Sequence, residues 1–201
     1  CCLNNLKQLG LSTMLYADDS NGDLVADTRG FPIEQRNPDD DDVNYLFPTY
    51  APNLKSFICP STQNTISNEL VVLTSGSKLV KDLMDNCPAG RLAGRGTSYE
   101  IFGIMSEKTL QKKSERAINT FILVVNKANL GMKPGTSQVW LFSDADDPNP
   151  SGGKNNYPDK SDNHGDAGAN IMYCDGHAEW LPTKKYLNAY NISFDDNRTG
   201  P

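Results

Sequence analysis

The N-terminal stretch constrains this chain most, because it has the pattern of a helix from its first residues. Apolar side chains in residues 1–17 recur at spacings that share one broad helical face: Leu3, Leu6, Leu11, Met14 and Leu15. Asn21 and Gly22 follow, a pair that tolerates the left-handed backbone at which helices end. No capping residue stands ahead of the pattern, so we expect that a longer helix has been cut upstream of Cys1.

Length and charge limit the classes of protein that the chain can represent. With 201 residues and no stretch of linker composition, we expect a single domain, with residues 1–19 as the helix and residues 20–201 as a head. A hydrophobic fraction of 37% indicates a thin core with long polar connections. The 19 basic and 25 acidic residues give a net charge of -6, which argues against nucleic acid as a partner. No run is long and apolar enough to cross a bilayer, so membrane attachment is expected only through the absent part of the helix.

The clearest local pattern is a β-hairpin near the C-terminus. Residues 170–174 and 177–181 read as strands, and Asp175 and Gly176 between them suit a two-residue turn. That turn pairs Cys174 with His177, and the pairing continues outward along the two strands. It predicts one apolar face made of Ile171, Tyr173, Ala178 and Trp180, with His177 and Glu179 on the opposite, solvated face.

Shorter segments give further expectations. Strand-like patterns cover residues 69–73, 98–104, 121–125 and 138–142. Residues 78–84 have helical spacing, and residues 43–47, which follow the acidic run 39–42, suit a short helix stopped by Pro48. Residues 108–116 form a charged excursion, which predicts an exposed loop or helical turn.

The cysteines leave two interpretations open. Their number, five, is odd, so at least one thiol stays unpaired or links chains. Cys59 precedes Pro60 at the expected exit from a strand, where Cys1 or Cys2 on the first helix could reach it as a disulfide. Cys2 and Cys59 are the pair we consider, with two buried thiols as the alternative.

An acidic stretch after a predicted strand suggests calcium. Asp144, Asp146 and Asp147 concentrate carboxylate oxygens, which calcium prefers as ligands. The spacing does not follow the EF-hand template, which favours the alternative of a solvated acidic loop. Calcium is the one cofactor that we expect from the sequence.

Two histidines flank the hairpin. His164 precedes it, and Asp175, Gly176 and His177 form its turn, so a transition-metal site is one hypothesis. The turn alone explains Asp175 and Gly176, and an exposed strand position explains His177, so a structural motif is favoured. His164 would then hold the hairpin in place through a hydrogen bond. No known catalytic motif is present, which predicts a protein that is not an enzyme.

Both ends of the chain match one family pattern. Residues 2–19 and the set formed by His164 and residues 170–179, which includes Asp-Gly-His, carry the likeness; residues 57–61 and Ser98-Tyr99 are weaker matches. The chain thereby resembles bacterial type IV pilin-like and type II secretion pseudopilin-like proteins, specifically the prepilin-type processing-associated group.

The resemblance implies both a fold and a role. The fold would be α+β and pilin-like, with a long N-terminal helix packed on a small antiparallel sheet that carries long loops. The precursor would have a leader, a site for prepilin peptidase and a membrane-spanning helix, so that the head lies outside the cytoplasm, anchored to the inner membrane. Copies would associate through the missing helix into a filament that works with pilus or secretion machinery. Major pseudopilins hold calcium in a C-terminal loop, which favours Asp144 and Asp146 as ligands.

Two other functions remain open from the sequence. The first is an extracytoplasmic binding module for glycan or a surface partner, which would use the loops around Trp140, Tyr157 and Trp180. The second is a metal-dependent hydrolase that uses His164, Asp175 and His177. If the pilin-like interpretation holds, the sequence does not distinguish a pilus subunit from a secretion pseudopilus subunit or a tethered surface protein.

Overall fold

The chain folds as a mixed α+β structure. The computed structural model describes residues 2–24, 42–84, 94–105, 111–122, 131, 133–145 and 157–194. The helices and strands are α1 (Cys2–Asp19), β1 (Leu70–Val72), β2 (Lys78–Val80), β3 (Tyr99–Ile101), α2 (Glu115–Thr120), β4 (Trp140–Asp144), β5 (Gly168–Tyr173), β6 (Ala178–Pro182) and α3 (Thr183–Ser193). Short 3-10 turns occur at η1 (Leu54–Phe57), η2 (Lys81–Leu83) and η4 (Gly165–Ala167).

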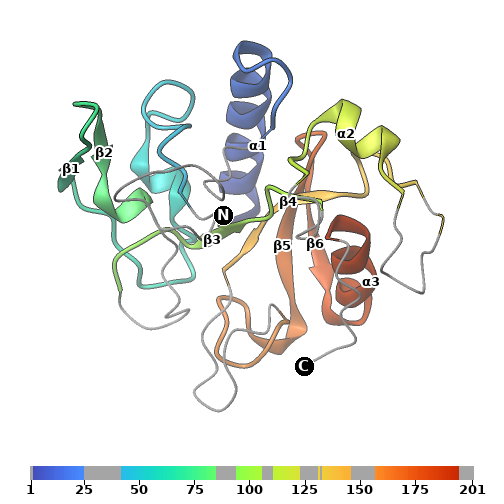
Figure 1. Ribbon diagram of the computed structural model, residues 1–201. Helices are drawn as coiled ribbons and strands as arrows, with labels where there is room; N and C mark the ends of the chain where they lie inside the picture. The colour runs from blue at the N-terminus through green and yellow to red at the C-terminus, as the bar shows by residue number, and fades with distance from the viewer. Residues whose placement is uncertain are drawn as a thin grey trace.

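The strands form two antiparallel sheets (Figure 1). The larger has four strands in the order β3-β4-β5-β6, and every neighbouring pair is antiparallel. The smaller is the β1-β2 hairpin, whose turn contains Gly76 with a positive φ of 82°. The α+β class expected from the sequence is therefore present, with an N-terminal helix and antiparallel sheets.

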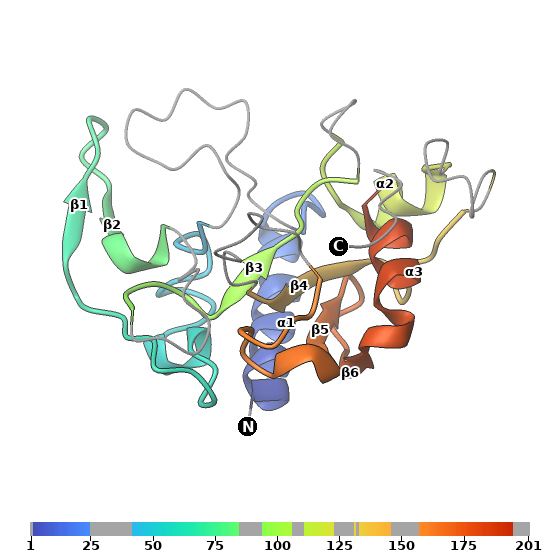
Figure 2. The ribbon, with the colours of Figure 1, turned by 90° about the horizontal axis from the view of Figure 1, so that it is seen from below.

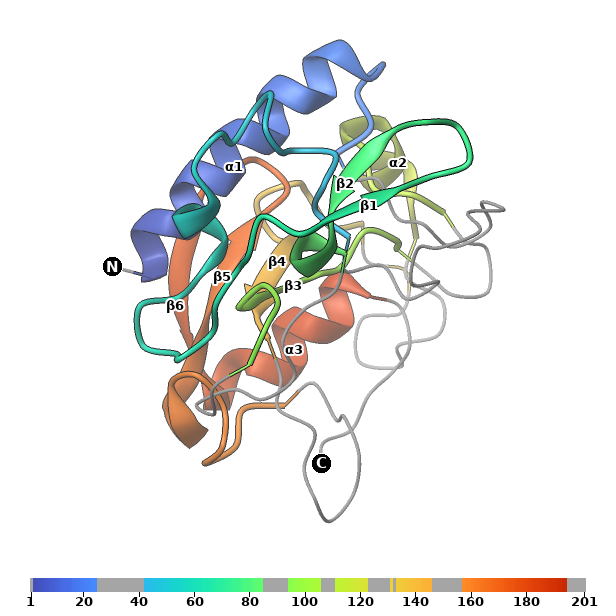
Figure 3. The same cartoon turned by 90° about the vertical axis from the view of Figure 1, so that its left-hand side faces the viewer.

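Helices cover both faces of the four-stranded sheet (Figures 2 and 3). Helix α1 contacts β5 and β6 on one face, and α3 contacts β4, β5 and β6 on the other. Alternate residues of β5 enter different clusters: Met172 packs with residues of α1, whereas Ile171 and Tyr173 pack with Tyr186 and Tyr190 of α3. All residues of β5 are buried as a result, which is typical of a strand covered on both sides.

The buried face of α1 differs from the one that hydropathy predicts. Its buried positions are Cys2, Leu6, Leu9, Gly10, Ser12, Thr13 and Ala17. Leu11 and Leu15, which we expected on the buried face, are 64% and 47% exposed. The expectation was wrong for these two leucines because Gly10 and Ser12 take part in the buried stripe: Gly10 lies against the backbone of Gly176, and Ser12 donates to the carbonyl of Tyr50. No helix in the described part of the chain is long and apolar enough to span a membrane.

The end of α1 agrees with the sequence. The helix stops at Asp19, and Asn21 and Gly22 adopt positive φ angles of 57° and 85°. The Gly22 N–H donates to the carbonyl of Ala17, which caps the last turn. The Asn-Gly pair therefore ends the helix as expected.

The β5-β6 hairpin is present, but its register is shifted by one residue from the prediction. Met172 pairs with Ala178 and Ile171 with Glu179, whereas a two-residue turn would pair Met172 with Glu179. The loop is longer because the N–H of Tyr173, not that of Cys174, donates to the carbonyl of His177. Gly176 has a φ of 85°, which suits a type I turn that ends in a glycine bulge.

The shift changes which side chains share a face. Ala178 and Trp180 lie with Met172 on the side of α1, opposite to Ile171 and Tyr173, so the apolar face that we predicted does not form. His177 and Glu179 lie beside Tyr173 instead: the His177 ring stacks on Tyr173 at 4.4 Å, and the Tyr173 hydroxyl donates to Glu179.

Three other local expectations need correction. Residues 78–84 form strand β2 and turn η2 in place of a helix, because Lys78–Val80 pairs with β1. Residues 44–50 form turns, not a short helix. Of the predicted strand 121–125, residues 121 and 122 follow α2 without strand pairing, and residues 123–125 lie outside the described residues.

Candidate functional site

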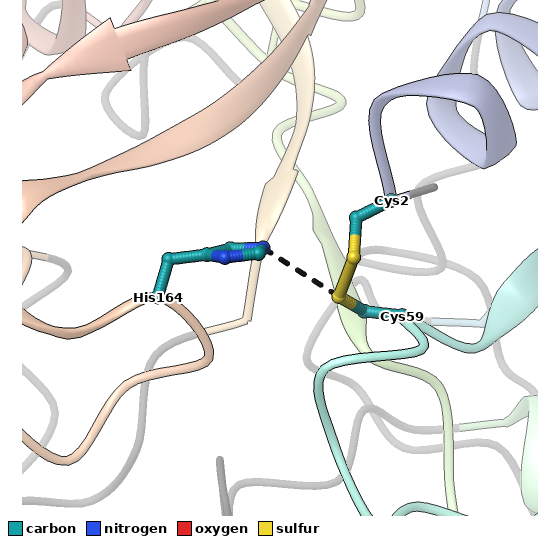
Figure 4. Close-up of side chains that lie close together, drawn as sticks. All are labelled: Cys2, Cys59 and His164. Atoms are coloured by element: carbon teal, nitrogen blue, oxygen red, sulfur yellow. Dashed lines mark hydrogen bonds between the residues drawn. A yellow bond between two sulfur atoms is a disulfide. The ribbon is translucent and has the colours of Figure 1, made fainter.

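The candidate site lies where three segments distant in the sequence meet (Figure 4). Cys2 comes from the first turn of α1, Cys59 from the chain after η1, and His164 from the loop before β5. The side-chain amide of Asn5 donates to the carbonyl of Ile58 at 2.7 Å and so fixes the segment after η1 against α1. This contact places Cys59 beside the start of the helix.

Cys2 and Cys59 are joined by a disulfide in the structure. Their Cα atoms are 4.8 Å apart, and both side chains are buried. The bond ties the start of α1 to a position 57 residues away. Cys174 is a free and buried cysteine, and burial raises the pKa of its thiol to about 12.

The imidazole of His164 points at this disulfide. Its Nε2 lies 3.5 Å from Cys59 Sγ, 2.9 Å from the side-chain nitrogen of Asn170 and 3.5 Å from Asp144 Oδ2. The ring edge also packs against Trp180, at 5.6 Å between centroids. His164 is held by residues of three strands and loops, and it remains partly exposed.

The hydrogen bonds of Asn170 determine which nitrogen of His164 carries a lone pair. The side-chain amide nitrogen of Asn170 donates to Asp144 Oδ2 at 2.9 Å, and this fixes the orientation of the amide because the same oxygen also accepts from the Asn170 backbone N–H. The same nitrogen faces His164 Nε2, so Nε2 is the acceptor in this pair. In the neutral ring the proton then resides on Nδ1.

Asp144 is a buried carboxylate at the end of β4. Its Oδ2 accepts from the backbone N–H of Asn170 at 2.6 Å and from the Asn170 side chain. Its Oδ1 is buried and makes no hydrogen bond of ordinary geometry with the described residues. Burial raises the pKa of Asp144 to about 7, against the hydrogen bonds from Asn170, which lower it.

A small cavity adjoins these groups. Its lining includes Asp144, Tyr157, Asp162, His164 and Tyr186, and its volume is about 10 Å³. That volume corresponds to about one water molecule. The cavity is too small for an organic substrate, so the arrangement of His164 and Asp144 fits proton or metal chemistry better than catalysis on a bound ligand.

The structure does not assemble a calcium site around the described part of the acidic stretch. The groups at Asp144 Oδ2 are N–H donors from Asn170, whereas calcium requires oxygen ligands. Asp146 and Asp147 lie outside the described residues. Calcium binding by these three residues stays a prediction.

Asp175, Gly176 and His177 form the hairpin turn, at the opposite end of β5 from His164. Asp175 Oδ1 accepts from the backbone N–H of His177 and lies 2.5 Å from its Nδ1. Asn170, the partner of His164, lies three strand positions before the end of β5 at Tyr173, or about 10 Å, and Asp175 lies beyond that end in the turn. His164, Asp175 and His177 therefore do not share one site, which removes the geometric basis for the proposed hydrolase.

The aromatic residues considered for a binding surface are also separated. Trp140 is fully buried among Phe102, Tyr186 and Tyr190 on the α3 side of the sheet. Trp180 is 40% exposed, but it lies on the α1 side. The two indoles therefore cannot act as one exposed platform.

One residue and one contact of the site escaped the sequence analysis. Asn170 is a strand residue that nothing in the pattern distinguishes from a solvated one, yet it bridges Asp144 and His164. The proximity of Cys59 to His164 joins positions 105 residues apart, which a single sequence does not reveal. One signal was available: an amide and an aspartate at adjacent strand positions of a buried sheet need each other as partners.

Comparison with known proteins gives no assignment. No protein-family model, no curated protein and no solved structure matches this chain.

Proposed function

We propose that this chain is the extracytoplasmic head of a bacterial pilin-like or pseudopilin-like subunit, a non-enzymatic protein that assembles into a filament. The precursor would be anchored to the inner membrane by a hydrophobic helix and processed by prepilin peptidase. The resemblance of residues 2–19, and of His164 with residues 170–179, to that group motivates the proposal. We propose, as part of the same hypothesis, that the α+β fold of this chain is a pilin-like fold.

The surface of α1 is the observation that carries it. One stripe of the helix packs on the sheet, while Leu11 and Leu15, one turn apart, are exposed on another stripe. Large apolar side chains in adjacent turns of a helix are suited to contact with another helix. Contacts of this kind between different surfaces of identical subunits produce an open helical assembly.

A substitution in the full-length precursor tests the proposal. The intact reading frame is expressed in a bacterium with its prepilin peptidase, and membrane and sheared surface fractions are probed for the protein. We expect the wild-type precursor in both fractions, and we expect Leu11→Lys to lose the sheared fraction while it keeps the membrane fraction. The head should remain folded in this variant, since Leu11 is exposed.

Val72→Lys is the matched control. Val72 is 56% exposed on β1, in the separate hairpin, so the same change in polarity and charge occurs away from α1. It should assemble as the wild type does. Recovery of the wild-type precursor only in the soluble cytoplasmic fraction, or normal assembly of Leu11→Lys, would contradict the proposal.

A further inference from the structure

We propose that Cys2, Cys59 and His164 bind a zinc ion when the disulfide between the two cysteines is reduced. The oxidised chain has no such site, because both sulfurs are then bonded to each other. The site and the disulfide are alternative states of the same three side chains. This inference is independent of filament assembly.

The positions of the ligand atoms favour zinc. The two sulfurs and a ring nitrogen of His164 all lie within 4.8 Å of one another. Zinc binds sulfur at about 2.3 Å and imidazole nitrogen at about 2.0–2.1 Å, and at a tetrahedral angle these bonds place the two atoms about 3.5 Å apart. The distance from Cys59 Sγ to His164 Nε2 is 3.5 Å. One edge of the tetrahedron is therefore already in place.

The acceptor nitrogen of His164 is the one that lies beside the sulfur, 3.5 Å from Cys59 Sγ. Nε2 is the acceptor nitrogen, as the orientation of Asn170 establishes, and Figure 4 shows the ring aimed at Cys59. On metal binding, the Asn170 amide gives up its bond to Nε2 and keeps its bond to Asp144. Partial exposure of His164 provides a route for the ion, and water completes the coordination.

The reduction can be written as a balanced step. A trialkylphosphine attacks one sulfur and breaks the S–S bond; water then supplies an oxygen to phosphorus and its two hydrogens to the two sulfurs. The phosphine is oxidised by two electrons to its oxide, and the disulfide is reduced to two thiols. Zinc binding then releases one proton from each thiol, and the thiolates become ligands. A newly synthesised chain already has its cysteines in the thiol form.

The experiment must exclude zinc binding by the other cysteines. Cys174 is a poor competitor, because burial keeps its thiol protonated at neutral pH. Cys1 and Cys87 lie outside the described residues, so both are replaced by serine in the protein used for the test. Any stoichiometric binding that remains then depends on Cys2 and Cys59.

Zinc content and cobalt spectra test the proposal. The chain is reduced with the phosphine, desalted without oxygen and mixed with Zn²⁺ or Co²⁺. We expect one zinc per reduced chain after gel filtration, a sulfur-to-cobalt charge-transfer band, and neither in the oxidised chain. Circular dichroism is recorded in parallel to follow folding. If the reduced chain unfolds, and zinc neither binds to it nor refolds it, the result counts against the proposal.

The two histidines provide a matched pair of variants. His164→Gln should weaken zinc binding by about tenfold or more, since it removes a ligand. His177→Gln replaces the only other histidine, at the far end of β5, and should bind as the parent does. Equal effects of the two substitutions, absence of zinc from a folded reduced chain, or equal binding by the oxidised chain would overturn the proposal.

Discussion

Gly10 of α1 lies against the backbone of Gly176 in the β5-β6 turn. A β-carbon on Gly10 would be 2.5 Å from the carbonyl oxygen of Gly176, closer than side chains in folded proteins approach backbone atoms. The helix and the hairpin therefore meet through their main chains at this point. The absence of a side chain at Gly10 sets the distance between α1 and the sheet.

Gly10→Ala should destabilise the fold by about 2 kcal/mol, because the clash with Gly176 is with backbone and requires the helix to shift. Alanine is the better helix former by about 1 kcal/mol, so a stabilising result would indicate that the helix does not pack here. Urea unfolding measures the change. Gly135→Ala is the control: nothing lies within 4 Å of its added β-carbon, and we expect a change within about 0.5 kcal/mol.

Loss of the disulfide should lower the free energy of unfolding by about 4 kcal/mol. It closes a loop with a sequence separation of 57 residues, and chain entropy in the unfolded state gives this magnitude. Thermal unfolding of Cys59→Ser, with and without reductant, measures the effect. The wild type should fall to the level of the variant under reductant, while the variant should not respond. A wild type that is indifferent to reductant would mean that the bond contributes nothing.

Asn170→Asp should destabilise the protein at neutral pH by at least about 2 kcal/mol. The substitution removes the donor shared by Asp144 and His164 and places a second carboxylate beside a buried one. The loss should diminish in acid, where the added charge is neutralised. Asn188→Asp, on an exposed position of α3, should be close to neutral. Similar stabilities for the two variants would refute the bridging role of Asn170.

The stability of the oxidised chain should fall as the pH rises from about 4 to about 7. The pKa of Asp144 is about 7 in the folded state, because the carboxyl is buried, against an ordinary value of 3.8. Between these values the folded state keeps a proton that the unfolded state has lost, so each rise in pH favours unfolding. The full effect is on the order of 4 kcal/mol.

Asp144→Asn isolates this effect from other titrating groups, among them His164 and Asp162, which line the same cavity. Denaturant unfolding of both proteins is measured across the interval, with a chelator present. The difference between wild type and variant should change steadily in favour of the variant as the pH rises. Parallel curves would show that Asp144 titrates at its ordinary pKa in the folded chain.

Local patterns in the sequence predicted much of the secondary structure but less of its orientation. The end of α1 was predictable because Asn21 and Gly22 suit few conformations other than a helix stop. The hairpin was predictable, but its register was not, because Asp-Gly suits both a two-residue turn and the longer turn with a glycine bulge. The buried face of α1 escaped prediction because hydropathy ranks Leu11 above Gly10, whereas packing selects Gly10.

The candidate site was less accessible to prediction. His164 was singled out by its place before the hairpin, but its neighbours Cys59 and Asp144 come from other parts of the chain. These contacts depend on how the segments before β5 and after η1 pack beside β4 and β5, and local periodicity contains no information about that. The structure is needed to bring the three together.

Strand β5 is enclosed between α1 and α3, and this arrangement sets the order in which the fold can form. A ribosome or an export channel delivers a polypeptide from its N-terminal side, so α1 emerges long before β5 and β6, the strands on which it packs. The part of its buried stripe that packs on the sheet stays uncovered until β5 and β6 have followed. The packing of α1 on the sheet is therefore a long-range event, which the last strands and not the helix itself control.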